Sequence, residues 1–262
     1  MLFRSLEVSG AKKPHYQLLK SKLAPLLGDM RLRLFIPPIL FRIIRCSNDD
    51  IKALSKFFSM KSLLQTREGE PPPPPPLLRS QVVQFNILAS ELMTTSPWNP
   101  PPIEELERIE STLYFSTHNA PTMMDLWRLW PRYSVDGYSL KYPQISPDVP
   151  VLMMNGDLDP QTPFWMAQRA FSHYKSSSSK ISPKSFLALI SGAPHGTPFF
   201  SPVTNSSIPC GLSLMSSFAT SSGQSLDLSC LSHLEPFDWM GKSEMMKRLS
   251  SYFLGTPDMW QL

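Results

Sequence analysis

Two short loops carry residue types that work together in catalysis. The first loop, Asn155 to Pro163, reads NGDLDPQTP and contains Asp157 and Asp159. The second loop, Gly192 to Thr197, reads GAPHGT and contains His195. A histidine can take a proton from a nucleophile, while a carboxylate fixes the tautomer of the imidazole and stabilises its charged form. The two loops therefore predict an acid and a general base that act as a pair.

Each loop follows an apolar run that is typical of a strand buried on both faces. Val149 to Met154 precedes the first loop, Phe186 to Ile190 precedes the second, and a helix is expected between them at Pro163 to Tyr174. Strand, helix and strand within about 45 residues form a right-handed βαβ unit of a parallel sheet. Because the loops at the carboxyl ends of such strands converge, we expect a carboxylate of the first loop and the His195 imidazole to lie within hydrogen-bond reach, about 2.6 to 3.2 Å apart.

The residues before this unit have a different character, and the sequence predicts two domains. Residues 1–147 are expected to be helical and irregular, whereas residues 148–262 carry the α/β pattern. Caps and helical spacing of apolar residues support this division. The expected helices are Asp49 to Phe58, Gln81 to Met93 and Ile103 to Leu113.

A proline run interrupts the first region. Six prolines, Pro71 to Pro76, lie in the stretch Arg67 to Leu78. Such a run cannot form a helix or a central strand, so we expect an exposed polyproline II linker. It could serve as a docking peptide for an aromatic groove, but we interpret it as a spacer.

Composition excludes several classes of protein. The chain has 262 residues, of which 42% are hydrophobic and 18% are charged, so it is expected to be largely globular. The net charge is only +4 and the basic residues are scattered, which argues against a nucleic-acid partner. The longest apolar stretch, Leu34 to Ile44, is too short to span a membrane. No spacing typical of a zinc site and no nucleotide-binding glycine motif is present, so we expect neither a metal nor a cofactor.

The two loops, together with Pro209-Cys210-Gly211 and Ser229-Cys230-Leu231, resemble the carboxyl-terminal part of α/β-hydrolase serine peptidases of the tripeptidyl aminopeptidase and prolyl aminopeptidase type. Three upstream pieces are more weakly similar to the cap of that family. They are Arg45-Cys46 to Asp50, Ser90-Glu91-Leu92 and Trp130-Pro131-Arg132-Tyr133. The resemblance implies a partial α/β-hydrolase fold, in which a helical cap region is followed by the last βαβ strands of the core sheet and the amino-terminal core strands are absent.

The resemblance also implies site residues and a substrate. Asp159 aligns with the acid of the catalytic triad and His195 with the base, and Asp157 is then a neighbour outside the triad. The substrate would be a peptide with a free amino terminus, from which single residues or tripeptides are released. An acidic side chain would pair with the terminal ammonium group, and Glu91 is our candidate for that role.

The chain departs from the family in one essential respect. The family presents its serine in a Gly-x-Ser-x-Gly turn upstream of the acid and the histidine, and no such pentapeptide occurs in residues 1–262. Two interpretations stay open. The chain is either the carboxyl-terminal part of a serine exopeptidase, inactive alone and lacking its amino-terminal half, or a non-catalytic peptide-binding or scaffold protein derived from a hydrolase.

The three cysteines bear on the cellular compartment. We expect Cys210 and Cys230 to form a disulfide and Cys46 to stay single. A disulfide persists only in an oxidising compartment, and Asn205 heads an Asn-Ser-Ser glycosylation sequon that fits the same compartment. The resemblance likewise implies a secreted or lumenal protein, although no signal peptide is visible in Met1 to Lys13.

Overall fold

The computed structural model describes residues 15–60, 80–92, 102–116, 120–133, 148–176 and 184–261. The polyproline stretch 67–78 therefore lies outside the described residues. The chain divides into two compact units, one that combines residues 22–59 with 148–261 and another that contains 15–21 and 60–133. The sequence predicted a boundary at residue 147 with everything before it in one region. The structure instead assigns residues 22–59 to the same unit as the α/β segment.

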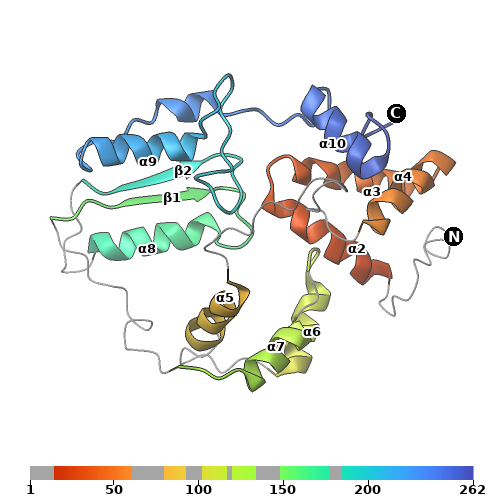
Figure 1. Cartoon of the computed structure of the whole chain (residues 1–262), viewed down its shortest axis with the longest axis horizontal. Helices are drawn as coiled ribbons and strands as arrows, with labels where there is room; N and C mark the ends of the chain where they lie inside the picture. Colours follow the sequence, from red (N-terminus) through yellow and green to blue (C-terminus); the bar gives the residue numbers. More distant parts are fainter. Residues whose placement is uncertain are drawn as a thin grey trace. The chain divides into compact units, whose positions relative to one another are not determined.

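The described elements are mainly helical (Figure 1). The unit with the sheet contains η1 (Ala24–Gly28), η2 (Leu32–Phe35), α3 (Ile36–Arg45), α4 (Asn48–Ser59), β1 (Leu152–Gly156), α8 (Phe164–Ser176), β2 (Phe186–Ile190), α9 (Cys210–Thr220), η5 (Ser229–His233) and α10 (Glu244–Leu254). The other unit contains most of α2 (His15–Leu23), α5 (Gln81–Ile87), the π-helix η3 (Leu88–Leu92), α6 (Ile103–Thr112) and α7 (Ala120–Leu129).

The expected strands and the helix between them are present. β1 pairs with β2 in parallel, in a register that sets Leu152 opposite Phe186 and Gly156 opposite Ile190. The first strand begins later than expected, and the Val151 N–H donates to the Ser185 hydroxyl at 3.2 Å instead of to a main-chain carbonyl of β2. Helix α8 lies on one face of the strand pair and α9 on the other (Figure 1).

β2 is buried on one face only, since Leu189 on its other face is 39% exposed, so the expected burial on both faces is wrong for this strand. Ala188 and Ile190 of β2 are buried together with Ala193, Cys210 and Leu214. Apolar area removed from water contributes about 25 cal/mol per Å² to folding. This small cluster fixes the end of β2, from which the histidine loop departs.

The amino-terminal helices find their burial elsewhere in the same unit. Helix α4 packs against α3 and against α10, and the rings of Phe35 and Phe253 lie 5.5 Å apart. Leu54 and Phe57 of α4 are fully buried. The apolar faces of α3 and α4 need a partner, and α10 supplies it from the other end of the chain. This packing is why the predicted boundary at residue 147 does not separate these helices from the α/β segment.

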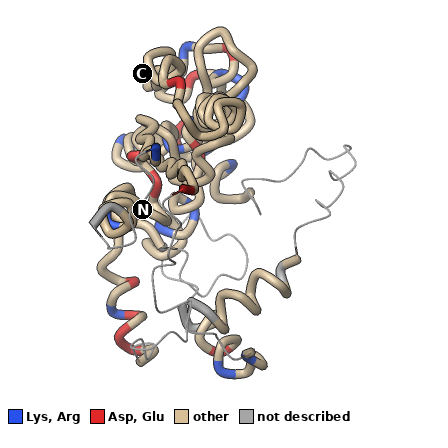
Figure 2. The backbone as a smooth tube through the Cα atoms, turned by 90° about the vertical axis from the view of Figure 1, so that its left-hand side faces the viewer, with Lys and Arg blue, Asp and Glu red and all other residues tan. Residues whose placement is uncertain are grey.

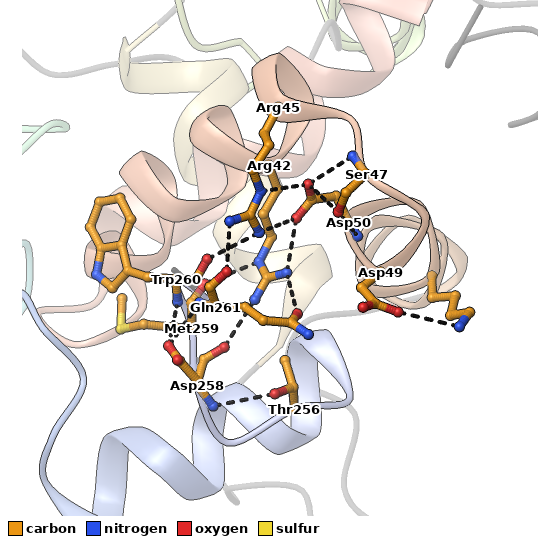
Figure 3. Close-up of polar contacts among 11 residues, drawn as sticks. Arg42, Arg45, Ser47, Asp49, Asp50, Thr256, Asp258, Met259, Trp260 and Gln261 are labelled. Carbon is orange, nitrogen blue, oxygen red and sulfur yellow. Dashed lines mark hydrogen bonds and ion pairs between the residues drawn. The ribbon is translucent and has the colours of Figure 1, made fainter.

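A buried arginine joins these same distant segments (Figure 3). The side chains of Arg42 and Asp50 are both 0% exposed, and Arg42 Nη1 lies 3.1 Å from Asp50 Oδ1. The guanidinium also donates to the carbonyls of Asp258 (2.9 Å) and Met259 (3.1 Å) and to the side-chain oxygen of Gln261 (2.9 Å). One buried charge thus holds the carboxyl-terminal segment against α3.

Asp50 has further donors that complete the cluster. Arg45 donates to both of its carboxylate oxygens, at 2.7 and 2.8 Å, and Ser47 donates through its N–H and its hydroxyl, at 2.9 and 2.7 Å. The hydrogen bond from Arg45 holds the pKa of Asp50 well below its ordinary value, although burial alone raises it. The chain turns into this arrangement at Cys46, whose φ of 57° is left-handed. Asp50 is therefore ionised and fully paired.

The disulfide between Cys210 and Cys230 is present, with the Cα atoms 5.4 Å apart, and Cys46 is free and exposed, as expected. The disulfide links α9 to η5 and is compatible with an oxidising compartment. Asn205 lies in an exposed turn with a φ of 60°, and its glycosylation stays a prediction.

Acidic and basic positions are interspersed along the described backbone (Figure 2). The absence of a nucleic-acid partner stays a prediction. None of the helices in the described ranges is both long and apolar enough to cross a lipid bilayer.

We predict that Asp50→Asn lowers the free energy of unfolding by about 3 to 5 kcal/mol, because it leaves the buried Arg42 charge without its counter-ion. The control is Asp49→Asn, since the Asp49 side chain is 61% exposed and pairs only with Lys52. Its loss is expected to stay below about 1 kcal/mol. Urea denaturation of both variants measures the two values, and equal losses would contradict the role given to Asp50.

We predict that the double change Cys210→Ala and Cys230→Ala costs about 3 kcal/mol of stability, because a closed loop of this length restricts the unfolded chain. Cys46→Ala is the matched control and is expected to change stability by less than about 0.5 kcal/mol, since its side chain is exposed. Thermal unfolding under non-reducing conditions compares them. A double variant as stable as the control would show that the disulfide contributes nothing.

Candidate functional site

The parallel register places the two loops at one edge of the sheet. Gly156 ends β1 opposite Ile190, which ends β2. The loops that follow β1 and β2 therefore start at the same edge of the sheet, next to each other. The acid loop, residues 157–163, and the histidine loop, residues 191–197, start from these two points.

Asp159 and His195 meet at this edge. The Nδ1 atom of His195 lies 2.9 Å from Oδ2 of Asp159, within the distance expected from the sequence. The Asp159 side chain is only 4% exposed, whereas that of His195 is 45% exposed. The carboxylate is thus enclosed by protein while the imidazole faces outward, which is the arrangement that an acid supporting a general base requires.

Asp159 is held by hydrogen bonds from its own loop. Its Oδ1 accepts from the N–H groups of Gln161 (2.8 Å) and Thr162 (2.9 Å), and its Oδ2 accepts from the hydroxyl of Thr162 (2.7 Å). Burial raises the pKa of Asp159, but the hydrogen bonds from Thr162, His195 and Gln161 outweigh burial, so its pKa lies below the ordinary value. The carboxylate is therefore ionised at neutral pH.

The ionised carboxylate determines which ring nitrogen carries the proton. An ionised carboxylate only accepts hydrogen bonds, so Nδ1 of His195 must be the donor toward Asp159. The Thr162 hydroxyl oxygen lies 3.3 Å from the same nitrogen and donates its own proton to Asp159. The neutral imidazole then keeps a lone pair on Nε2, and no described residue makes a hydrogen bond with that atom. Nε2 is free to act as a base.

Asp157 has a separate role, as the sequence indicated. Its carboxylate accepts from the N–H of Gly192 at 2.6 Å and from the hydroxyl of Ser191 at 3.0 Å. These bonds tie the start of the histidine loop to the acid loop. Asp157 therefore fixes the relative position of the two loops and makes no hydrogen bond with the imidazole.

Glycine is required where the loops approach most closely. A Cβ atom on Gly156 would lie 1.9 Å from the carbonyl oxygen of Ala193. Gly196, directly after His195, has a φ of 76°, a conformation that other residues rarely adopt. The glycines of the two motifs thus serve the close contact of the loops.

Three contributing residues were not singled out in the sequence. Thr162 contacts both members of the pair, and Asn155 closes the acid loop by donating to the Thr162 carbonyl at 3.0 Å. Both lie inside the stretch Asn155 to Pro163, so their polar side chains close to Asp159 in the sequence could have indicated that they contact it. Arg33, which donates to the Leu158 carbonyl, lies more than a hundred residues away, and no local pattern links it to the loop.

The role predicted for Glu91 is not tested by the described atoms. Glu91 belongs to the other compact unit and its side chain is outside the described residues. No group of three histidine, cysteine or acidic residues able to hold a metal occurs in the part of the chain that is described.

Comparison with known proteins gives no assignment. No protein-family model, no curated protein and no solved structure matches this chain. The chemistry of the site must be argued from its geometry.

We predict that Asp159→Asn moves the neutral His195 ring to the tautomer with its proton on Nε2. The N–H groups of Gln161 and Thr162 hold an oxygen at the Oδ1 position, so the new NH₂ group takes the Oδ2 position and donates to Nδ1. Ring ¹⁵N chemical shifts measured at about pH 9, where imidazole is ordinarily neutral, report the tautomer.

The matched control is Asp227→Asn. Asp227 is likewise a carboxylate that accepts from a nearby main-chain N–H, that of Ser229, and it has no contact with the imidazole. The control is expected to keep the wild-type ¹⁵N shifts of His195. A wild-type tautomer in the Asp159→Asn protein would show that the carboxylate does not orient the ring.

Proposed function

We propose that this chain supplies the acid and the general base of a serine-peptidase-type hydrolytic site that acts on peptides with a free amino terminus. The observation that carries the proposal is the enclosed Asp159 carboxylate, 2.9 Å from a half-exposed His195 whose Nε2 is free. An orienting acid behind an accessible imidazole serves proton transfer directly.

The residues of the site would have the following roles. Nε2 of His195 takes the proton of an attacking serine hydroxyl and later gives it to the departing amine. Asp159 stabilises the imidazolium that forms between these two transfers. The mechanism uses no cofactor. The release of amino-terminal residues or tripeptides, and the pairing of Glu91 with the substrate ammonium, rest on the resemblance alone.

The nucleophile would come from outside residues 1–262, from the amino-terminal half that completes the partial α/β-hydrolase fold. Neither a Gly-x-Ser-x-Gly turn in the sequence nor a described serine beside Nε2 supplies it here. A partner segment would also provide the N–H groups that stabilise the oxyanion.

The outer edge of β1 is a place where such a segment could bind. The Val151 carbonyl accepts from Phe186, and the Asp157 N–H donates to the last carbonyl of β2, so alternate residues of β1 face β2. The main-chain groups of Leu152 and Met154 therefore face away from β2, and no described strand pairs with them. A parallel strand added there would end beside Asp159 and His195, the edge at which a nucleophile is needed.

A non-catalytic peptide-binding or scaffold protein is the second candidate. The lack of a Gly-x-Ser-x-Gly turn in residues 1–262 favours it, because a protein that only binds needs no nucleophile. An oriented acid and base are not needed for binding, however, and we therefore favour the hydrolytic function.

The test is to purify the chain from its native host with its bound proteins and assay it with aminoacyl and tripeptidyl reporter substrates and a fluorophosphonate probe. We expect the isolated chain to be inactive. We expect hydrolysis by the complex, with the probe attached to a serine of the partner. His195→Gln is expected to lower kcat/KM by about 10⁶-fold, as loss of a triad histidine does.

His233→Gln is the matched control, since His233 is an exposed histidine outside the site, and it is expected to leave the rate unchanged. Hydrolysis that persists in the His195→Gln complex would contradict the proposed base. A complex that binds peptides and shows no hydrolysis or labelling would establish the binding function instead.

A further inference from the structure

Arg33 connects the helical segment 22–59 to the acid loop. It lies in η2 and is only 8% exposed. Its Nη2 atom donates to the carbonyl of Leu158 at 3.1 Å. Leu158 is separated from Arg33 by 125 residues and stands between Asp157 and Asp159, so the contact reaches the centre of the acid loop.

The Leu158 main chain depends on such contacts, because its side chain is 44% exposed and little apolar packing fixes it. Its N–H donates to the carbonyl of Ala193 in the histidine loop at 3.3 Å. Its carbonyl, which belongs to the peptide group that leads into Asp159, is held by Arg33. The two hydrogen bonds fix the residue from opposite sides, toward the histidine loop and toward η2.

Arg33 is itself held firmly. The guanidinium also donates to the carbonyls of Leu27 and Asp29, and the Asp29 carboxylate accepts from the N–H groups of Arg31 (2.8 Å) and Leu32 (2.9 Å). The turn between η1 and η2 is thus closed by its own hydrogen bonds. Because the Arg33 guanidinium is fixed by this turn, its hydrogen bond can define the position of the Leu158 carbonyl.

The charge of Arg33 adds to the effect. Burial lowers the pKa of Arg33, and the fields of Asp29, Asp157 and Asp159 oppose that change. Arginine keeps its proton far above neutral pH, so the group is charged. A buried cation beside the acid loop therefore attracts the two carboxylates of that loop as well as binding its carbonyl.

We propose that Arg33 is a positioning residue, which acts through the Leu158 carbonyl to hold Asp159 on Nδ1 of His195. The proposal rests on the proposed function of the pair, but its test requires no hydrolysis. Because Arg33 belongs to η2, the packing of the amino-terminal helices would then influence the site at the end of the sheet.

The test compares Arg33→Met with Arg31→Met by ring ¹⁵N shifts of His195 at about pH 9. Methionine keeps most of the apolar stem and removes every donor. Arg31 comes from the same segment but pairs with Glu235 at the surface, where the two side chains are 39% and 41% exposed. We expect Arg33→Met to lose the predominance of the Nδ1–H tautomer and Arg31→Met to keep it. Arg33→Lys, with one charged donor group, is expected to restore part of it.

The outcomes separate the two proposals. A wild-type protein without the Nδ1–H tautomer would overturn the orienting role of Asp159, and with it the proposed function. A wild-type protein that has this tautomer, together with an Arg33→Met protein that keeps it, would overturn only the role of Arg33. If Arg33→Met does not fold, Arg33→Lys decides. A fraction of the Nδ1–H tautomer below that of the wild type supports the role of Arg33, and an unchanged fraction overturns it, because a lysine cannot reproduce the set of hydrogen bonds that the guanidinium makes. Circular dichroism and the intact disulfide report whether each variant is folded.

Discussion

The site depends on the parallel pairing of β1 and β2. Since Gly156 lies opposite Ile190, the loops after β1 and β2 start next to each other at one edge of the sheet. A shift of one residue would move Asp159 relative to His195 and would turn the buried side chains of β2 toward the wrong face. The pairing is in turn fixed by burial between α8 and α9, and the disulfide of Cys210 ties α9 to the segment that follows.

Two buried arginines connect the amino-terminal helices to the rest of their unit. Arg42 donates to the Asp50 carboxylate and to main-chain carbonyls near the carboxyl terminus, such as that of Asp258. Arg33 donates to the carbonyl of Leu158. A buried charge is costly unless its donors are satisfied. Each guanidinium therefore favours one arrangement of the segments around it, because other arrangements leave donors unpaired. The same chemistry that stabilises the unit also places the acid loop.

Electrostatics distinguish the two carboxylates of the acid loop. Asp159 is enclosed and accepts hydrogen bonds from Thr162, Gln161 and His195, so it stays ionised and orients the ring. Asp157 accepts a hydrogen bond from the Gly192 N–H and so fixes the start of the histidine loop. One short loop thus provides two carboxylates with different roles, and no described residue makes a hydrogen bond with Nε2 of His195.

The sequence by itself determined the elements and the pair of residues at their ends. Short apolar runs predicted β1 and β2, and the polar loops after them predicted that a carboxylate and His195 meet, because local composition and strand order are enough for both. The choice of Asp159 over Asp157 came from the family resemblance. The tertiary structure alone decided that residues 22–59 pack with α10 and that Arg33 reaches the acid loop. Those contacts join residues far apart in the chain, and their energy comes from burial and hydrogen bonds that no local pattern records.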